Sequence, residues 1–159
     1  MTRTHSLFTG ESRHMGCPMS EVLLSEHGNW RRLHWGALYS AYGRTPYFDY
    51  VADDIHRVIH GQQAHLLDYN QQLCQVVIEF MDLPVRLVYQ PVSSVPDEAL
   101  DLRRTIGTKQ PDHLPITTVP YYQQWSDKNG FIPDLSILDL MMNMGREGIY
   151  TLVEMVKYS

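Results

Sequence analysis

The chain has 159 residues, of which 43% are hydrophobic and 19% are charged, a composition typical of one folded domain rather than a disordered chain. Its net charge is −5 and no segment is strongly basic, so duplex nucleic acid is not an expected partner. No stretch reaches the roughly 18 apolar residues of a membrane span, and the N-terminus lacks the apolar core of a secretory signal. The two cysteines make no disulfide framework, which fits a cytoplasmic location.

The N-terminal part of the chain is predicted to form a tail, a short strand and a helix. Residues 1–16 are polar and lack periodicity, so we expect a loose tail before a single domain over 17–159. A strand is predicted over 21–25. A helix is predicted from about residue 29 to 42, and apolar side chains on both of its flanks indicate that it is mostly buried.

The middle of the chain predicts further helices and a second strand. Two short helical segments are expected between residues 46 and 60, separated by a new cap at the paired aspartates. The clearest helix is 63–82, because apolar residues recur there at helical spacing. Within it, Cys74 is predicted to be a small core residue. A strand is predicted over 85–89.

The C-terminal part combines a proline-rich stretch with two helices. Residues 90–120 hold five prolines, and long irregular stretches of this kind are often functional. A helix is predicted over 135–144, capped by Pro133 and Asp134, and a last helix over 147–156. The predicted fold class is therefore α/β, predominantly helical with a few short strands, in a single and possibly incomplete domain.

Three histidines close together in the sequence are candidate metal ligands. His56 and His60 lie four residues apart, so they share a helix face and are able to grip a metal, but solvated histidines on a polar face are the simpler interpretation. A helix break at Gly61 is expected to separate them from His65. We therefore predict no metal site, and without a dinucleotide or phosphate-loop motif the sequence indicates no cofactor.

A second group of candidates mixes aromatic rings and cations. Trp30 lies on the apolar stripe of its helix, so packing and stacking on a sugar or base both remain open. His34 lies one residue off that stripe, as a boundary histidine or as a ligand contact. In the proline-rich stretch, Arg103 and Lys109 are suited to a phosphate or carboxylate, although an exposed charged turn over 101–104 explains the same pattern.

A third group of polar residues surrounds the penultimate helix. Residues 121–125 are two tyrosines, two glutamines and a tryptophan, either as neutral recognition groups or as a half-buried strand with Tyr121, Gln123 and Trp125 on one face. Ser136, Asp139 and Asn143 fall on one stripe of an otherwise apolar helix. Because buried polar groups need partners or a ligand, we expect this stripe to lie partly buried beside a pocket; solvent exposure is the alternative.

Three stretches of the chain resemble one known protein family. They are CPMSEVLLSEHGNWRRLHWGALYSAYGRTPYFDYVADDI (17–55), DLRRTIGTKQ (101–110) and PYYQQWSDKNGFIPDLSILDLMMNMG (120–145). Together they resemble the WbqC-like protein family, in the form found in Bacteroides-type bacteria, over about residues 17–155. Members of that family usually begin with a further N-terminal segment, so the resemblance implies that this chain is truncated.

The resemblance implies a function in O-antigen or surface-polysaccharide biosynthesis, as a transferase of an aminoacyl (glycine) or related group that uses a small-molecule or activated-sugar substrate. The matching positions include Trp30, His34, Arg103, Lys109, Tyr122, Gln123, Ser136, Asp139 and Asn143. On this hypothesis Arg103 and Lys109 hold the donor and Asp139 is the general base, while neutral side chains orient the acceptor. The alternatives are a non-enzymatic binding or scaffold protein of the same pathway, or an inactive truncated remnant.

Overall fold

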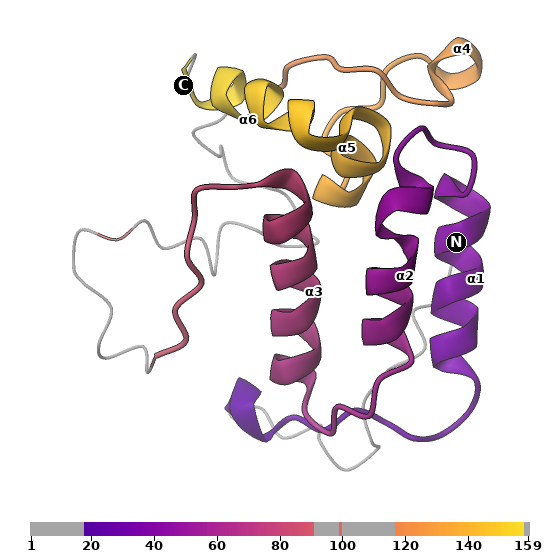
Figure 1. Cartoon of the computed structure of the whole chain (residues 1–159), viewed down its shortest axis with the longest axis vertical. Helices are drawn as coiled ribbons and strands as arrows, with labels where there is room; N and C mark the ends of the chain where they lie inside the picture. The colour runs from indigo at the N-terminus through magenta and orange to yellow at the C-terminus, as the bar shows by residue number, and fades with distance from the viewer. Residues whose placement is uncertain (1–17, 91–98, 100–116, 158–159) are drawn as a thin grey trace.

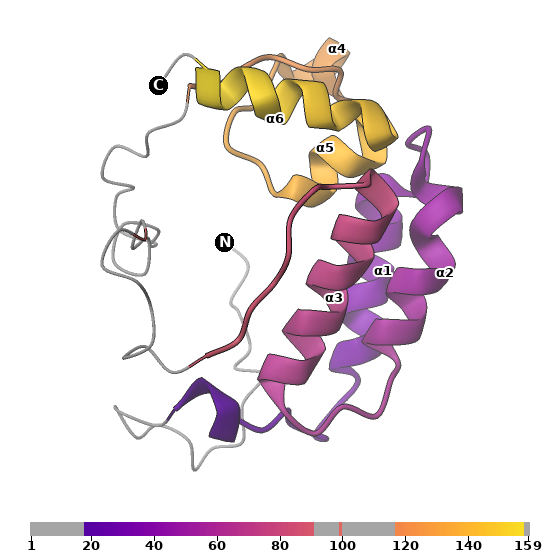
Figure 2. The same ribbon diagram turned by 60° about the vertical axis from the view of Figure 1, so that its left-hand side comes forward.

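The computed structural model describes residues 18–90, 99 and 117–157, and this part of the chain is mostly helical, as predicted. Helices α1 (Trp30–Tyr42), α2 (Phe48–Ile59) and α3 (Leu66–Met81) run side by side, with α2 packed against both of the others (Figure 1). Helices α5 (Ile137–Met144) and α6 (Gly148–Lys157) lie across one end of this layer (Figure 2). The short elements are η1 (Met19–Glu21), α4 (Ser126–Asn129) and η3 (Gly145–Glu147).

The core forms where α2 meets α3 and α5. Five side chains of α2 are buried, and they recur at helical spacing along one face: Phe48, Val51, Ile55, Val58 and Ile59. Met81 from α3 and the run 140–142 from α5 close this core from the end of the layer. Each such side chain contributes about 1.5–3 kcal/mol by leaving water, so this contact holds α5 in place.

Helix α1 has the predicted bounds but not the predicted burial. None of its residues is fully buried, and Leu33 on its outer face is 65% exposed. Trp30, Trp35 and Leu38 pack against the core only in part. The two apolar flanks misled the prediction because α1 is the edge helix of the layer, and an edge helix has a neighbour on one side only.

The two short helical segments predicted between residues 46 and 60 form one continuous helix, α2. The aspartates expected to cap a second segment lie on its outer side, where Asp53 is exposed and Asp54 pairs with Arg57 at 2.9 Å. Their side chains therefore face solvent and do not interrupt the backbone hydrogen bonds. The helix ends before Gly61, as predicted.

Neither predicted strand is confirmed among the described residues. Near 21–25 an antiparallel bridge joins Leu23 to His65, supported by the hydrogen bond from Leu24 N to Ala64 O. Residues 85–89 are exposed and form no ladder within the described part of the chain. The α/β assignment stays a prediction for the remainder.

Helix α5 begins later than predicted. Asp134 adopts a left-handed conformation with φ of 57° and does not cap the helix. Ser136 is the capping residue, since its Oγ accepts a hydrogen bond from Leu138 N at 3.3 Å. None of the described helices is both long and apolar enough to cross a membrane.

Candidate functional site

The polar stripe of α5 is buried against an irregular segment of the chain, residues 117–125. Asp139 is 7% exposed and Asn143 is also buried, whereas Ser136 at the helix start is exposed. Asn143 donates from Nδ2 to Asp139 O at 2.8 Å and accepts from Gln124 N at 2.9 Å. The amide of Asn143 therefore ties the irregular segment to the helix.

The side chain of Gln123 also fixes the irregular segment, through hydrogen bonds to the backbone further along the chain. Its Nε2 donates to Ile132 O at 2.8 Å, and its Oε1 accepts from Ile132 N at 2.9 Å. One buried side chain thus satisfies both backbone groups of a residue nine positions away, as a strand partner would. Because they are used internally, the amides of Gln123 and Asn143 fix the shape of the segment.

Asp139 makes its side-chain hydrogen bond to Tyr121. The Tyr121 hydroxyl donates to Asp139 Oδ2 at 2.9 Å. Burial raises the pKa of Tyr121 to about 12, with the hydrogen bond and negative charge of Asp139 adding to that rise and a hydrogen bond from Gln123 opposing it. Burial, followed by the charge of Asp139, also raises the pKa of Tyr42 at the end of α1. Both phenols are therefore protonated at neutral pH and able to donate.

Tyr121 also lines a small hollow between the irregular segment, α5 and α6, which we call the Tyr121 hollow. Its volume is ≈ 200 Å³. The polar part of its lining is Thr117, Thr118, Tyr121, Asp134 and Ser136. Phe131, Leu135 and apolar side chains of α5 and α6 form the rest of the wall, so the lining is part polar and part apolar.

A larger hollow of ≈ 460 Å³ lies on the other side of Ile137, which lines both. We call it the aliphatic hollow, since its lining is almost entirely leucine, isoleucine and valine from the three-helix layer and from α5. His34 and Cys74 are among its few polarisable groups. Cys74 is exposed here, so its predicted place in the core was wrong; the face of α3 that carries it borders this hollow.

The aromatic candidates of α1 separate into a packing residue and a lining residue. Trp30 donates from Nε1 to Ser25 O at 2.6 Å and packs edge-on against Tyr69, which favours the packing interpretation. His34 contacts Trp30 edge-on, with ring centroids 5.5 Å apart, and borders the aliphatic hollow. Tyr122 is 54% exposed.

The predicted site residues are thus only partly brought together. Ser136, Asp139 and Asn143 lie along α5 from its cap to its last turn, and Gln123 lies in the irregular segment that hydrogen-bonds to that helix. His34 lines the aliphatic hollow, which shares Ile137 with the Tyr121 hollow. Arg103 and Lys109 lie outside the described residues, as does the charged turn predicted over 101–104. Their convergence with α5 remains a prediction.

Tyr121 and Tyr42 were not among the predicted site residues. The alternation of residues 121–125 contained the necessary signal, because it places Tyr121 on the same side as Gln123, which is buried. Tyr42 gave no such signal, since its proximity to Asp139 depends on how α1 meets α5.

The histidines of α2 form a stacked pair. The rings of His56 and His60 lie 4.0 Å apart between centroids, and Trp35 packs edge-on against His56 at 4.8 Å. His65 lies at the start of α3, separated from them by the turn after α2. Among the described residues no group of three or more potential ligands is arranged to hold a metal ion.

Comparison with known proteins identifies the class to which this architecture belongs. The model of the WbqC-like protein family matches residues 11–110, well over half of the chain. The chain therefore belongs to the WbqC-like protein family. The matched range contains the three-helix layer and ends before the Tyr121 hollow. No curated protein and no solved structure matches the chain.

Proposed function

We propose that this chain is a cytoplasmic transferase of O-antigen or surface-polysaccharide biosynthesis, which moves an aminoacyl group such as glycyl onto an amine of a sugar. Membership of the WbqC-like family supports the pathway through the resemblance described above. The observation that carries the chemistry is the hydrogen bond from Tyr121, which lines the Tyr121 hollow, to the buried carboxylate of Asp139 behind it.

Acyl transfer to an amine requires a proton acceptor, because the attacking nitrogen acquires a positive charge as the new C–N bond forms and the bond to the leaving group breaks. Tyr121 lines the hollow and donates a hydrogen bond to Asp139, so a lone pair of its hydroxyl is available to accept an N–H from the substrate. As the amine proton moves to the Tyr121 oxygen, the phenol's own proton moves to Asp139, which acts as the general base without touching the amine.

The size of the hollow limits what is transferred there. A volume of ≈ 200 Å³ is below the roughly 300–1,000 Å³ of sites that enclose a drug-sized ligand, so it accommodates an aminoacyl group but not a complete activated sugar. The remainder of the donor must lie outside it. In this proposal Arg103 and Lys109 hold the donor phosphate or carboxylate, and Ser136 and Tyr122 contact the acceptor.

Gln123 and Asn143 take a different part from the one predicted. Their amides are engaged by the backbone at residues 124 and 132, so we assign them to positioning Tyr121 and not to binding the acceptor. A positioning residue is expected to alter the geometry of the transfer step while leaving the chemical groups in place.

The proposed function is tested by deleting the gene in the organism that carries it and analysing the surface polysaccharide by mass spectrometry. A transferase predicts polysaccharide of normal length whose repeat unit lacks one aminoacyl substituent, restored when the wild-type chain is supplied. Polysaccharide of unchanged composition and unchanged amount would contradict the proposal.

The second candidate function is a non-enzymatic binding protein of the same pathway. The aliphatic hollow favours it, because ≈ 460 Å³ of almost wholly apolar lining offers shape and burial but few groups for chemistry. The same deletion separates the two candidates. A binding or scaffold protein predicts less polysaccharide, or shorter chains, with a repeat unit of normal composition.

A further inference from the structure

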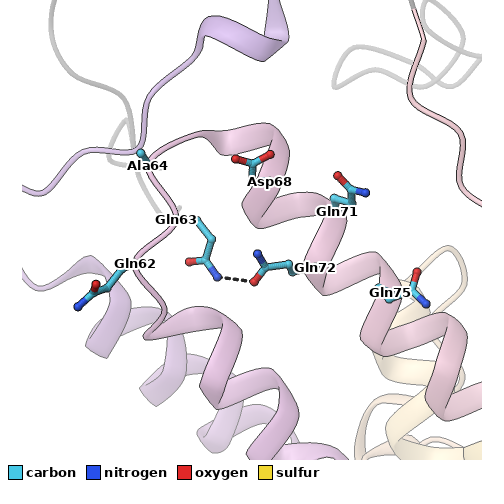
Figure 3. A pocket seen from close by; sticks show the side chains of 7 residues that line it. All are labelled: Gln62, Gln63, Ala64, Asp68, Gln71, Gln72 and Gln75. Atoms are coloured by element: carbon cyan, nitrogen blue, oxygen red, sulfur yellow. Dashed lines mark hydrogen bonds between the residues drawn. The ribbon is translucent and has the colours of Figure 1, made fainter.

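A third hollow, far from the Tyr121 hollow along α3, is lined by glutamine side chains. It lies beside the connection between α2 and α3 and the first turns of α3, and its volume is ≈ 670 Å³ (Figure 3). Its lining is Gln62, Gln63, Ala64, Asp68, Gln71, Gln72 and Gln75. We call it the glutamine hollow. It opens broadly to solvent, and nothing in the proposed transfer reaction uses it.

The backbone around the glutamine hollow is fixed. On the N-terminal side, Leu24 N donates to Ala64 O at 2.8 Å and Leu66 N donates to Val22 O at 2.9 Å. These bonds hold the connection to α3 in an extended form. The amide of Gln63 lies directly over Gly61, where a Cβ atom would come within 2.7 Å of Gln63 Oε1. The absence of a side chain at Gly61 therefore leaves room for the amide.

Two amides at the centre of the hollow are joined to each other. Gln63 Nε2 donates to Gln72 Oε1, as the dashed line in Figure 3 shows. A hydrogen bond between two primary amides uses one donor and one acceptor, so a carbonyl and an NH₂ group are left over whichever way each amide is turned. That leftover pair is what a hydroxyl group needs, since a hydroxyl both donates and accepts.

The side-chain carbonyl of Gln63 is left without a hydrogen bond. Gln63 Oε1 is buried from solvent and, among the described residues, has no hydrogen-bond partner. A buried carbonyl without a partner destabilises the conformation that contains it. A bound hydroxyl that donates to Gln63 Oε1 would supply the missing partner.

The composition of the lining selects the class of ligand. Among the described residues its lining contains no lysine or arginine to attract a phosphate or carboxylate, and Asp68 repels either. The same described lining contains no aromatic ring to stack on a nucleobase and only Ala64 as an apolar residue, so peptide side chains find no pocket. Five amides and one carboxylate match a neutral ligand with many hydroxyl groups.

From these contacts we infer that the glutamine hollow is a binding site for a neutral saccharide unit, with Gln63 and Gln72 recognising neighbouring hydroxyl groups. This inference goes beyond the proposed function. Saccharide binding here requires neither Asp139 nor Tyr121, and the transfer reaction could fail while this site still binds.

The test is a titration of the full chain, labelled with ¹⁵N, with the methyl glycosides of glucose, galactose, mannose and N-acetylglucosamine. At least one sugar should produce saturable shifts in the side-chain amide signals of Gln63 and Gln72, with a dissociation constant on the order of 1 mM. Absence of saturable shifts with all four sugars would overturn the inference.

A double variant in the hollow and a control variant on α3 sharpen the test. The double variant Gln63→Leu, Gln72→Leu should weaken binding at least about tenfold, a change of about 1.4 kcal/mol. Asn70→Leu is the matched control, because Asn70 is exposed on α3 but does not line the hollow, and its affinity should equal that of the wild type. Equal weakening by both variants, or tighter binding of N-acetyl-trialanine amide than of any sugar, would refute a saccharide site.

Discussion

The three-helix layer and the α5 region of this protein are stabilised in different ways. In the layer, α2 presents a continuous apolar face, and burial of side chains such as Phe48 and Val51 holds the helices together. Around α5, an irregular segment without secondary-structure partners is held by buried side chains, Gln123 and Asn143. The first arrangement builds a support, while the second positions individual polar atoms.

The difference shows why the candidate transfer site lies where it does. An apolar interface tolerates small shifts, because burial depends on area and not on direction. Hydrogen bonds are directional, and the pair at Gln123 and Ile132 fixes the backbone two residues after Tyr121. The Tyr121 hydroxyl is thereby held 2.9 Å from Asp139, as a proton relay requires.

The largest expected effect comes from breaking the apolar layer. Phe48 is 2% exposed at the start of α2, and Phe48→Ala should lower the free energy of unfolding by about 3–5 kcal/mol because it leaves a cavity at the centre of the core. Urea denaturation followed by circular dichroism measures this. Leu33→Ala on the exposed side of α1 is the control and should change stability by less than about 0.5 kcal/mol. Similar losses in both variants would show that α2 is not the core helix.

A smaller loss is expected from the polar region. Gln123→Ala removes two hydrogen bonds and leaves the backbone of Ile132 without partners, which should cost about 2–3 kcal/mol. Gln71→Ala, an exposed glutamine of α3, should be close to neutral in the same denaturation experiment. If Gln123→Ala is also neutral, the irregular segment is held by something other than this side chain.

The junction of the two regions depends on Gly145. Its φ of 58° and ψ of −139° are accessible essentially to glycine, and a Cβ atom there would lie 2.5 Å from Tyr47 Cε1. Gly145→Ala should therefore destabilise the protein by about 1–3 kcal/mol. Gly36→Ala provides the opposite control, since Gly36 lies within α1 with open space around it and alanine favours helix by about 1 kcal/mol. A stabilising Gly145→Ala would contradict this account of the junction.

The smallest effect concerns pH. The pKa of Tyr121 is raised to about 12 in the folded state from 10.0, so the unfolded chain loses this proton first as pH rises. Stability should therefore be unaffected by this group below pH 10 and should fall as the pH rises from 10 towards 12. Tyr121→Phe should make that fall shallower, while Tyr42 and Tyr69, whose pKa values are also raised, keep part of it. Urea midpoints measured across this range test the prediction; identical slopes for wild type and variant would refute it.

Local patterns predicted much of the helical layer. The bounds of α1 and α3 follow from apolar spacing and from the residues that stop a helix, which are properties of neighbouring residues. The same patterns failed where the outcome depends on distant partners. Residues 21–25 and 85–89 look like strands, but a strand requires a neighbouring strand, and the described part of the chain provides none for 85–89.

The helix that carries the candidate site was predicted, but the tyrosine that pairs with its aspartate was not. The spacing of Ser136, Asp139 and Asn143 indicated a polar stripe, and the stripe is found on α5 with its last two members buried. That spacing does not indicate that Tyr121, 18 residues away, donates a hydrogen bond to Asp139. Such a pairing depends on the path of the irregular segment, which is fixed by tertiary hydrogen bonds and not by local periodicity.

The central claim is that the Tyr121–Asp139 pair carries out proton transfer, and the most direct measurement is the aminoacyl content of the polysaccharide in the deletion strain supplied with Asp139→Asn. Asparagine has nearly the same shape and can still accept the Tyr121 hydrogen bond, so folding should be preserved, as circular dichroism of the purified variant would show. We predict that Asp139→Asn fails to restore the substituent, whereas Asp127→Asn on exposed α4 restores it fully. Full restoration by a correctly folded Asp139→Asn would contradict the claim.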